Sequence, residues 1–200
     1  MVEQNLTGSA YHIPVLIDDI LNIANPVHGK WLDGTIGAGG YTTALLEAGA
    51  SHVTGIDRDP SVFKILIDLQ EKFKNRLTLV QDVFSNLEDH GEALQGVVLD
   101  LGVSSMQLDQ NARGFSFQRD GPLDMRMSQA GKTGADLVNR LSEKELADLL
   151  FYYGEERASR RIAKAIVSRR QIAEFKYTRD LVDVIQSVLP RAKPGQIHPA

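Results

Sequence analysis

The feature that most constrains the fold is a glycine-rich segment, residues 34–40, which directly follows a short apolar stretch ending at Asp33. Residues 30–33 have the composition of a β-strand, and residues 43–48 have that of a helix. A glycine turn between a strand and a helix lets a ligand approach the backbone closely. The segment therefore predicts a strand–loop–helix unit of an α/β protein, with the loop as part of a ligand site.

Strands and helices continue to alternate after this unit. Apolar stretches at residues 52–56, 77–80 and 97–99 are predicted as strands, and Pro60 begins a predicted helix that runs to about Phe73. This alternation is typical of an α/β fold with a doubly wound parallel sheet. Four strands are few for such a sheet, and the fourth is normally an inner one, so we expect the chain to be the front part of a longer protein.

The pattern changes after about residue 105. Residues 106–133 are rich in glycine and charged residues and have no clear period, which predicts a long ordered loop of functional importance. Helices are predicted after a capping box at Ser142, from about residue 156 to 172, and after Thr178. The architecture is therefore expected to change from α/β to mainly helical.

Aspartates lie at or just after the ends of all four predicted strands, at Asp33, Asp57, Asp82 and Asp100. Ligands of doubly wound sheets bind at this edge. A carboxylate beside the glycine loop repels a pyrophosphate such as that of NAD, and it favours the ammonium and sulfonium groups of S-adenosylmethionine. Asp57 has the spacing for ribose hydroxyls, and Asp82 or Phe84 can reach an adenine. Each aspartate alone could equally be a turn former or a helix cap, and the pocket is favoured by the four together.

Charge is unevenly distributed. Residues 151–200 hold 10 Lys and Arg against 5 Asp and Glu, whereas residues 1–150 hold 12 against 21. Four basic residues of the last quarter have the spacing of one helical face: Arg157, Arg160, Arg161 and Lys164. We favour a contact with RNA phosphates; the alternative is a solvated face paired with Glu155 and Glu156.

Composition excludes several classes of site. The chain has no cysteine and its five histidines are scattered, so no thiol nucleophile or Cys-ligated metal exists and no metal site is predicted. No apolar run reaches the ~18 residues that span a bilayer. Residues 1–5 show no signal or transit peptide. We therefore expect a cytoplasmic protein without membrane contact.

A set of motifs spans most of the chain, at residues 12–16, 33–40, 57–60, 99–105, 107–109, 113–117, 120–127 and 153–157. The most specific is Asp-Gly-Pro-Leu-Asp-Met-Arg-Met at residues 120–127. By these motifs the chain resembles the MraW/RsmH family of S-adenosylmethionine-dependent methyltransferases, which modify the exocyclic N4 of a cytidine in small-subunit (16S) ribosomal RNA. The resemblance implies that activity, with S-adenosyl-L-methionine as cofactor and small-subunit ribosomal RNA or the small ribosomal subunit as partner.

The resemblance also implies a fold and a set of contacts. Residues 1–105 would form a Rossmann-like class I methyltransferase sheet, incomplete in this chain, and residues 106–200 an inserted helical domain for substrate recognition. The resemblance implies cofactor contacts at Gly39, Gly40, Tyr41, Asp57, Phe84, Asp100 and Gln107. The reasoning about the glycine loop and the carboxylate before it adds Gly37 and Asp33 to the predicted contacts. The family usually has His where Tyr41 stands and often Pro where Met106 stands.

Methyl transfer to a cytosine amine requires an acceptor for its N–H, so that the nitrogen lone pair localises. Asp100 is the candidate, with cofactor binding alone as its alternative role. RNA contacts within the long loop are predicted for Arg113, Phe115, Arg119 and Arg126. For Phe117 we favour a structural role, in which the ring anchors the loop to the core, over stacking on a base.

Two other functions stay open from the sequence. One is a methyltransferase of the same fold that acts on a small molecule or a protein, which would not need the basic helix. The other is a non-enzymatic nucleotide- or RNA-binding module or remnant, against which Asp33, Asp57 and Asp100 together with the full glycine loop argue. The oligomeric state is also open, with a homodimer as one alternative.

Overall fold

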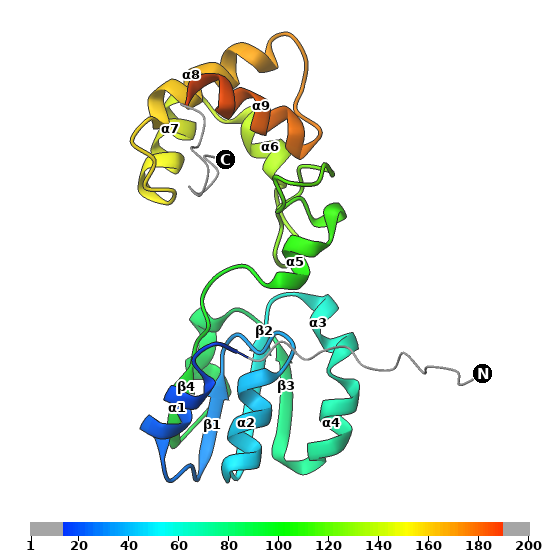
Figure 1. Ribbon diagram of the computed structural model, residues 1–200, viewed down its shortest axis with the longest axis vertical. Helices are drawn as coiled ribbons and strands as arrows, with labels where there is room; N and C mark the ends of the chain where they lie inside the picture. Colours follow the sequence, from blue (N-terminus) through cyan, green and yellow to red (C-terminus); the bar gives the residue numbers. More distant parts are fainter. Residues whose placement is uncertain (1–13, 190–200) are drawn as a thin grey trace, which may run out of the picture. The chain divides into compact units, whose positions relative to one another are not determined.

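The computed structural model describes residues 14–189. It divides the chain into two compact units, Met1–Gly102 and Val103–Ala200. Residues 12 and 13 of the first motif, the prediction made for residues 1–5, and the chain beyond residue 189 lie outside the described residues. Figure 1 shows a sheet with helices in the first unit and helices alone in the second.

The first unit contains a parallel sheet in the order β3-β2-β1-β4 (Figure 1). Its strands are β1 (Lys30–Asp33), β2 (His52–Asp57), β3 (Leu77–Gln81) and β4 (Leu94–Val98). The predicted α/β class and parallel sheet are confirmed. The fourth strand begins three residues before its predicted start and ends at Val98, because Leu94 and Gly96 also pair with β1. The first residues of this strand were not predicted from the sequence, because they include Gly96 and glycine has a low strand propensity.

The helices of the first unit are α1 (Ile17–Ala24), α2 (Gly40–Ala48), α3 (Pro60–Ile65) and α4 (Ile67–Phe73), with 3-10 turns η1 (Lys74–Arg76) and η2 (Phe84–His90). The single helix predicted from Pro60 to Phe73 is therefore wrong. It is interrupted at Leu66, which leaves the helical conformation and is buried. A Cβ on Gly39 would lie 3.1 Å from the Leu66 side chain, so the interruption lies where this segment packs against the glycine loop.

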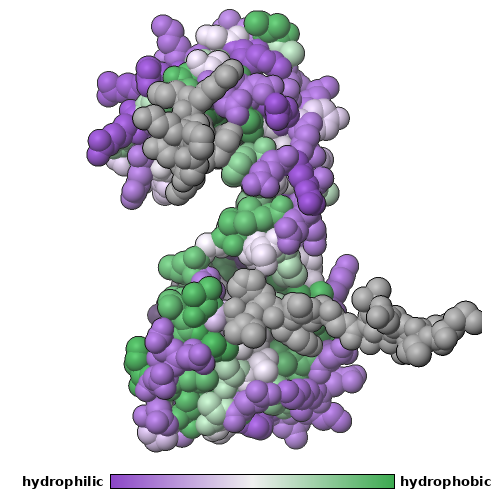
Figure 2. Space-filling view, in the orientation of Figure 1, coloured by the Kyte–Doolittle hydropathy of each residue, from purple (hydrophilic) through white to green (hydrophobic). Residues whose placement is uncertain are grey.

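The core of this unit lies between the central strands and α2. Leu32, Val53 and Ile56 of the sheet and Leu45 and Leu46 of α2 are almost fully buried. Figure 2 shows hydrophobic residues gathered on the side where α1 and β4 lie. There β4 forms one edge of the sheet, and Val97 stays exposed. Natural proteins usually cover an apolar edge of this kind.

The second unit consists of helices α5 (Ser105–Asp109), α6 (Gly134–Arg140), α7 (Glu143–Tyr152), α8 (Ser159–Arg170) and α9 (Thr178–Val188), with the 3-10 turn η3 (Asn111–Arg113). Its core includes Leu123, Leu146, Ile162, Ile166 and Phe175. The unit thus has a hydrophobic core of its own, to which the long loop contributes through Leu123.

Three predictions for this unit need correction. The segment 106–133 contains most of α5 and all of η3, so it is not entirely a loop. Helix α6 was missed, although its capping box of Thr133 and Asp136 is visible in the sequence. Thr178 does not cap α9; the Asp180 carboxylate accepts from the backbone of Tyr177, the N-cap residue, and the Thr178 hydroxyl accepts from Gly121 N–H instead.

Replacing Gly96 with alanine should destabilise the first unit by roughly 1–3 kcal/mol, since a Cβ there would overlap the buried ring of Trp31 on the neighbouring strand. Urea unfolding followed by the fluorescence of Trp31, the single tryptophan, measures the effect. Gln81→Ala, at the exposed end of β3, is the control. Equal midpoints for Gly96→Ala and the control would contradict the close packing.

Candidate functional site

The glycine loop after β1 is held by the carboxylate of Asp33. Its Oδ2 accepts a hydrogen bond from Thr42 Oγ1 at 2.7 Å, and its Oδ1 accepts one from Thr35 N–H at 3.2 Å. One side chain thus connects the end of β1 to the loop and to the first turn of α2. Asp33 has no exposed surface. The structure therefore gives it a role in shaping the loop, while its predicted contact with a ligand ammonium stays a prediction.

Burial raises the pKa of Asp33 to about 6, against the hydrogen bonds from Thr42 and Thr35, which lower it. Desolvation disfavours the ionised carboxylate, and the hydrogen bonds compensate for only part of that cost. The nearby charge of Asp57 raises the pKa further. Near neutral pH the group is therefore ionised, and it becomes protonated in mild acid.

The glycines of the loop serve two different purposes. Gly37 and Gly39 both have positive φ, at 49° and 82°, which glycine adopts without strain. A Cβ on Gly39 would lie 2.5 Å from Leu69 Cδ2, so the close approach there is made by the protein itself. At Gly37 the nearest atom to such a Cβ would be Thr35 O, 3.8 Å away. The open part of the loop is therefore at Gly37, while Gly40 begins α2.

Asp57, at the end of β2, connects the second strand to the same loop. Its Oδ2 accepts from Gly37 N–H at 3.0 Å and its Oδ1 from Asp59 N–H at 2.9 Å. Burial raises the pKa of the Asp57 carboxyl, while these backbone donors lower it. The backbone of Arg58 is a third donor to this carboxylate. An ionised carboxylate has about four acceptor positions, so acceptor capacity remains for one hydroxyl of a ligand.

The end of β3 carries Asp82 and, two residues later, Phe84. The Asp82 carboxylate is occupied by His90 Nε2 at 2.7 Å and Asn86 Nδ2 at 3.0 Å, and the hydrogen bond from His90 lowers the pKa of Asp82. Phe84 is 39% exposed. Of the two residues predicted to reach an adenine, Phe84 is therefore the one with a free apolar surface.

Phe84 and Leu99 both lie against Gly34, the first residue of the glycine segment. A Cβ on Gly34 would overlap Leu99 Cδ2 and lie 3.2 Å from Phe84 Cβ. The glycine therefore allows two apolar side chains, from the ends of β3 and β4, to converge beside β1. Phe84 and Leu99 thus form an apolar surface beside Gly34, the residue that follows Asp33.

Asp100 lies two residues beyond β4. Its backbone N–H donates to Thr35 Oγ1 at 2.7 Å, and its residue is exposed. Tyr41 is buried, and burial raises the pKa of its phenol, with the nearby charge of Asp100 raising it further. Tyr41 is therefore protonated at neutral pH and can donate a hydrogen bond.

The structure brings most of the predicted cofactor residues to the carboxyl edge of one sheet: Asp33, Gly37, Gly39, Gly40, Tyr41, Asp57, Phe84 and Asp100. Gln107 instead belongs to the second unit. It caps α5, where its side chain accepts from Ser104 N–H at 3.1 Å. Sequence reasoning missed Thr35 and Thr42, because no spacing rule shows that a threonine will bind a carboxylate on another element.

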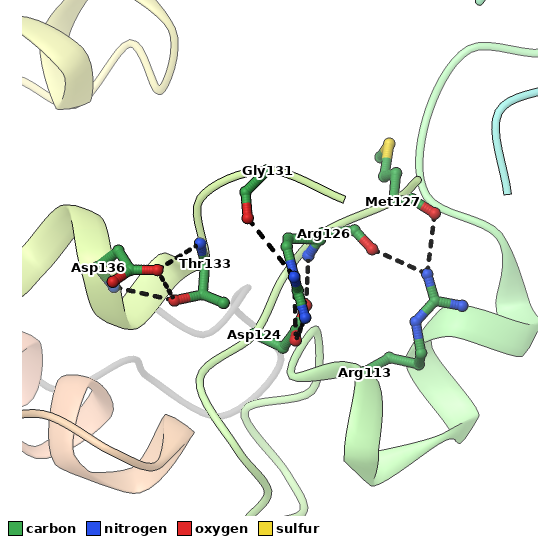
Figure 3. A network of polar contacts seen from close by, with 7 residues as sticks. All are labelled: Arg113, Asp124, Arg126, Met127, Gly131, Thr133 and Asp136. Atoms are coloured by element: carbon green, nitrogen blue, oxygen red, sulfur yellow. Dashed lines mark hydrogen bonds and ion pairs between the residues drawn. The ribbon is translucent and has the colours of Figure 1, made fainter. Parts of the chain in front are cut away.

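The loop of the second unit is held by two of the arginines predicted to contact RNA (Figure 3). Arg113 donates to the carbonyl oxygens of Arg126 and Met127, both at 3.0 Å. Arg126 forms a two-pronged ion pair with Asp124, with Nη2–Oδ2 at 2.7 Å and Nε–Oδ1 at 3.0 Å, and this lowers the pKa of Asp124. These arginines therefore have structural partners, and their RNA contacts stay predictions.

The other predicted RNA residues differ in exposure. In the loop Phe115 is half-buried, whereas Arg119 and Phe117 are exposed. The basic residues of the α8 region are all exposed: Arg157, Arg160, Arg161 and Lys164. Their side chains make no hydrogen bond or ion pair with residues 14–189, so the pairing with Glu155 and Glu156 considered above is not formed in that part of the chain.

Between residues 14 and 189, no three His, Asp or Glu side chains come together as metal ligands. Over the same residues no helix has the length and apolarity to cross a membrane.

The parallel sheet, with a glycine loop after β1 and aspartates at its carboxyl edge, defines a Rossmann-like unit. Residues 9–200 match the family model described as the MraW methylase family, and the chain belongs to that family. Membership of a methylase family implies a methyl donor of the S-adenosylmethionine type.

The chain is similar to curated proteins named "Ribosomal RNA small subunit methyltransferase H". One from Cereibacter sphaeroides (strain ATCC 17025) is 59% identical over 97% of this chain and 59% of its own length. One from Roseobacter denitrificans is 59% identical over 94% of this chain and 57% of its own. One from Ruegeria sp. (strain TM1040) is 55% identical over all of this chain and 61% of its own. The chain thus spans about three fifths of the length of these relatives.

Asp33→Asn should change how stability depends on pH. Because the folded protein raises the pKa of Asp33 from 3.8 to about 6, ionising this group costs wild-type stability as pH rises between those values. The unfolding free energy of the variant minus that of the wild type should therefore increase by up to about 3 kcal/mol between pH 4 and 7. Urea unfolding, followed by Trp31 fluorescence at several pH values, measures this difference.

The contributions of the other titrating carboxylates to the unfolding free energy cancel in that difference, because both proteins contain these groups. A difference that does not vary with pH would show that the Asp33 pKa is not raised.

Proposed function

We propose that the carboxyl edge of the sheet in the first unit binds S-adenosyl-L-methionine. The observation that carries this proposal is the open glycine at Gly37, whose N–H is bound by the Asp57 carboxylate. A carboxylate that occupies a loop amide opposes phosphate binding there. The same carboxylate, with Asp33 and Asp100, suits a ligand that carries an ammonium, a sulfonium and ribose hydroxyls.

Each of these side chains contacts a different group of the ligand. Asp57 accepts from a ribose hydroxyl, and Phe84 with Leu99 offers an apolar surface to the adenine. Asp33 keeps the loop in shape and adds negative charge for the ammonium group. Tyr41 donates from a protonated phenol, where the family usually has histidine. Gln107, from the second unit, is the remaining contact that we propose.

We further propose that the complete protein methylates the exocyclic N4 of a cytidine in 16S ribosomal RNA. When bound, the cofactor supplies an electrophilic methyl group on its sulfonium. Asp100, exposed and held by its backbone on Thr35, accepts a hydrogen bond from the amine and so increases the electron density on the nitrogen. The rest of the contribution is positioning. The names of the relatives support the RNA substrate, as does the unpaired basic face of α8.

In this proposal residues 1–105 bind the cofactor and residues 106–200 recognise the RNA or the small ribosomal subunit. The remaining part of the protein, present in the longer relatives, would supply further strands that cover the exposed edge at β4. A substrate that is a small molecule or a protein is disfavoured, because it gives no reason for the exposed cations of this region. Arg160, Arg161 and Lys164 lie on α8, and Arg157 lies in the turn before it.

Calorimetric titration tests the cofactor. We expect the chain to bind S-adenosylmethionine and not NAD, and we expect Asp57→Asn to weaken binding at least about 10-fold, since a charged hydrogen bond contributes roughly 1.5–3 kcal/mol. Asp68→Asn, an exposed aspartate of α4, is the matched control. Binding of NAD alone, or wild-type affinity in Asp57→Asn, would overturn the assignment.

A salt titration of RNA binding tests the basic face. Arg160→Glu combined with Arg161→Glu should weaken binding and reduce the slope of log affinity against log salt by about 1.4, at roughly 0.7 per lost contact with a single strand. Lys132→Glu with Lys176→Glu changes the net charge equally at other exposed positions and should keep the slope. Binding of S-adenosylmethionine should be unchanged in both proteins. Equal slopes for the two double variants would exclude a specific contact at α8.

A further inference from the structure

Three consecutive aromatic residues at the end of α7 are exposed. Phe151 is 51% exposed, Tyr152 72% and Tyr153 88%. The apolar face of this helix instead packs through Leu146, which is buried in the core, and Leu150, which lies against it. Tyr153 has the spacing of that face but lies beyond its last packed residue. These three rings are therefore not part of the hydrophobic core.

The turn after α7 places these rings beside the start of α8. Glu156 N–H donates to Leu150 O at 3.1 Å, so the chain folds back onto the last turn of α7. A Cβ on Gly154 would lie 2.8 Å from the same carbonyl oxygen, so this turn requires glycine. Helices α7 and α8 also share one core, in which Leu146 and Ile162 are both buried. The aromatic residues and the first turn of α8 consequently lie at the same end of the helix pair (Figure 1).

That end of the helix pair also carries the unpaired positive charge. Arg157 lies in the turn, and Arg160 and Arg161 lie in the first turn of α8, all exposed and without a side-chain partner among residues 14–189. The acidic groups nearby are Glu155, which is exposed, and Glu156, whose carboxylate accepts from Ala158 N–H. Hydrophilic residues surround the hydrophobic ones over much of the visible face of the second unit (Figure 2).

The rings themselves have a defined arrangement. Phe151 and Tyr152 have their centroids 5.3 Å apart and their planes at 80° to one another. An edge-to-face pair is a favourable aromatic geometry. Both residues of the pair keep more than half of their surface exposed. Exposed rings with unpaired arginines beside them are the two components by which proteins bind single-stranded nucleic acid.

We propose that Phe151, Tyr152 and Tyr153 form a stacking platform for unpaired bases of single-stranded RNA, with Arg157, Arg160 and Arg161 binding the adjoining phosphates. The proposal rests on the proposed function, in that RNA is the substrate, and adds that this surface selects unpaired strands. A protein partner could also cover exposed rings, but it gives no reason for the uncompensated charge beside them. RNA satisfies both components, since every base has a flat face and every linkage carries a negative charge.

Fluorescence anisotropy with two labelled RNAs of equal length tests the platform, one unstructured and one a perfect duplex. Phe151→Leu combined with Tyr152→Leu should weaken binding of the unstructured RNA roughly 5- to 100-fold, the usual effect of losing a stacked base. Binding of the duplex should change less than about 2-fold, and the salt slope should stay the same because no cation is lost. Tyr152→Trp, which keeps a ring, should retain the wild-type affinity.

The matched control is Tyr177→Leu, which removes an aromatic ring of 51% exposure from the residue before α9. It should bind both RNAs like the wild type. Circular dichroism and calorimetry with S-adenosylmethionine, run on every variant, show that the fold and the cofactor site are intact.

The outcomes separate this proposal from the one on which it rests. If Phe151→Leu with Tyr152→Leu binds the unstructured RNA like the wild type, the platform is excluded while cofactor and RNA binding stand. If the wild type binds S-adenosylmethionine but neither RNA, the platform is excluded, whereas the cofactor site stands and so does a substrate in the form of the small ribosomal subunit. If the double variant loses affinity for small ribosomal subunits but not for the unstructured RNA, the rings do not bind unpaired bases and the proposal is overturned.

Discussion

The arrangement of the first unit depends on a buried carboxylate that is bound from two directions. Asp33 receives hydrogen bonds from Thr42 in α2 and from Thr35 in the glycine loop. Because an uncompensated buried charge is costly, these contacts restrict the loop to conformations that keep both donors in place. Thr35 in turn accepts from Asp100 N–H with its hydroxyl, so the same constraint reaches the residue beyond β4.

A second carboxylate extends this connection to β2, since Asp57 binds the amide of Gly37. Two aspartates therefore hold the glycine loop. Asp33, at the end of β1, binds it from the buried side, and Asp57, at the end of β2, binds it at Gly37. Such a site is negatively charged where dinucleotide sites offer free amides to phosphate. We therefore propose that the groups that occupy the loop N–H donors decide between a cationic methyl donor and a dinucleotide.

The second unit separates its structural arginines from its exposed ones. Arg113 and Arg126 are bound to carbonyl oxygens and to Asp124, and they organise the loop that precedes α6. The basic residues of α8 have no such partners among the described residues and keep their charge available. Exposed aromatic rings at the end of α7 lie at the same end of the helix pair, and this end is the region that we propose for an unpaired RNA strand.

The sequence by itself determined the α/β class, the parallel strands, the aspartates at or shortly after the strand ends, and the basic residues on α8, of which Arg157 lies in the turn before the helix. It could do so because strand periodicity, glycine turns and helical spacing are local properties. The tertiary structure alone decided that Gly39 is needed for packing against Leu69, whereas a Cβ on Gly37 would overlap no neighbour and would meet only Thr35 O at 3.8 Å. It also decided that Asp33 binds Thr42 and that Arg126 pairs with Asp124. The burial of a side chain and its hydrogen-bond partners depend on which elements meet in space. The interruption of the helix at Leu66 and the exposure of Tyr153 depend on tertiary packing for the same reason.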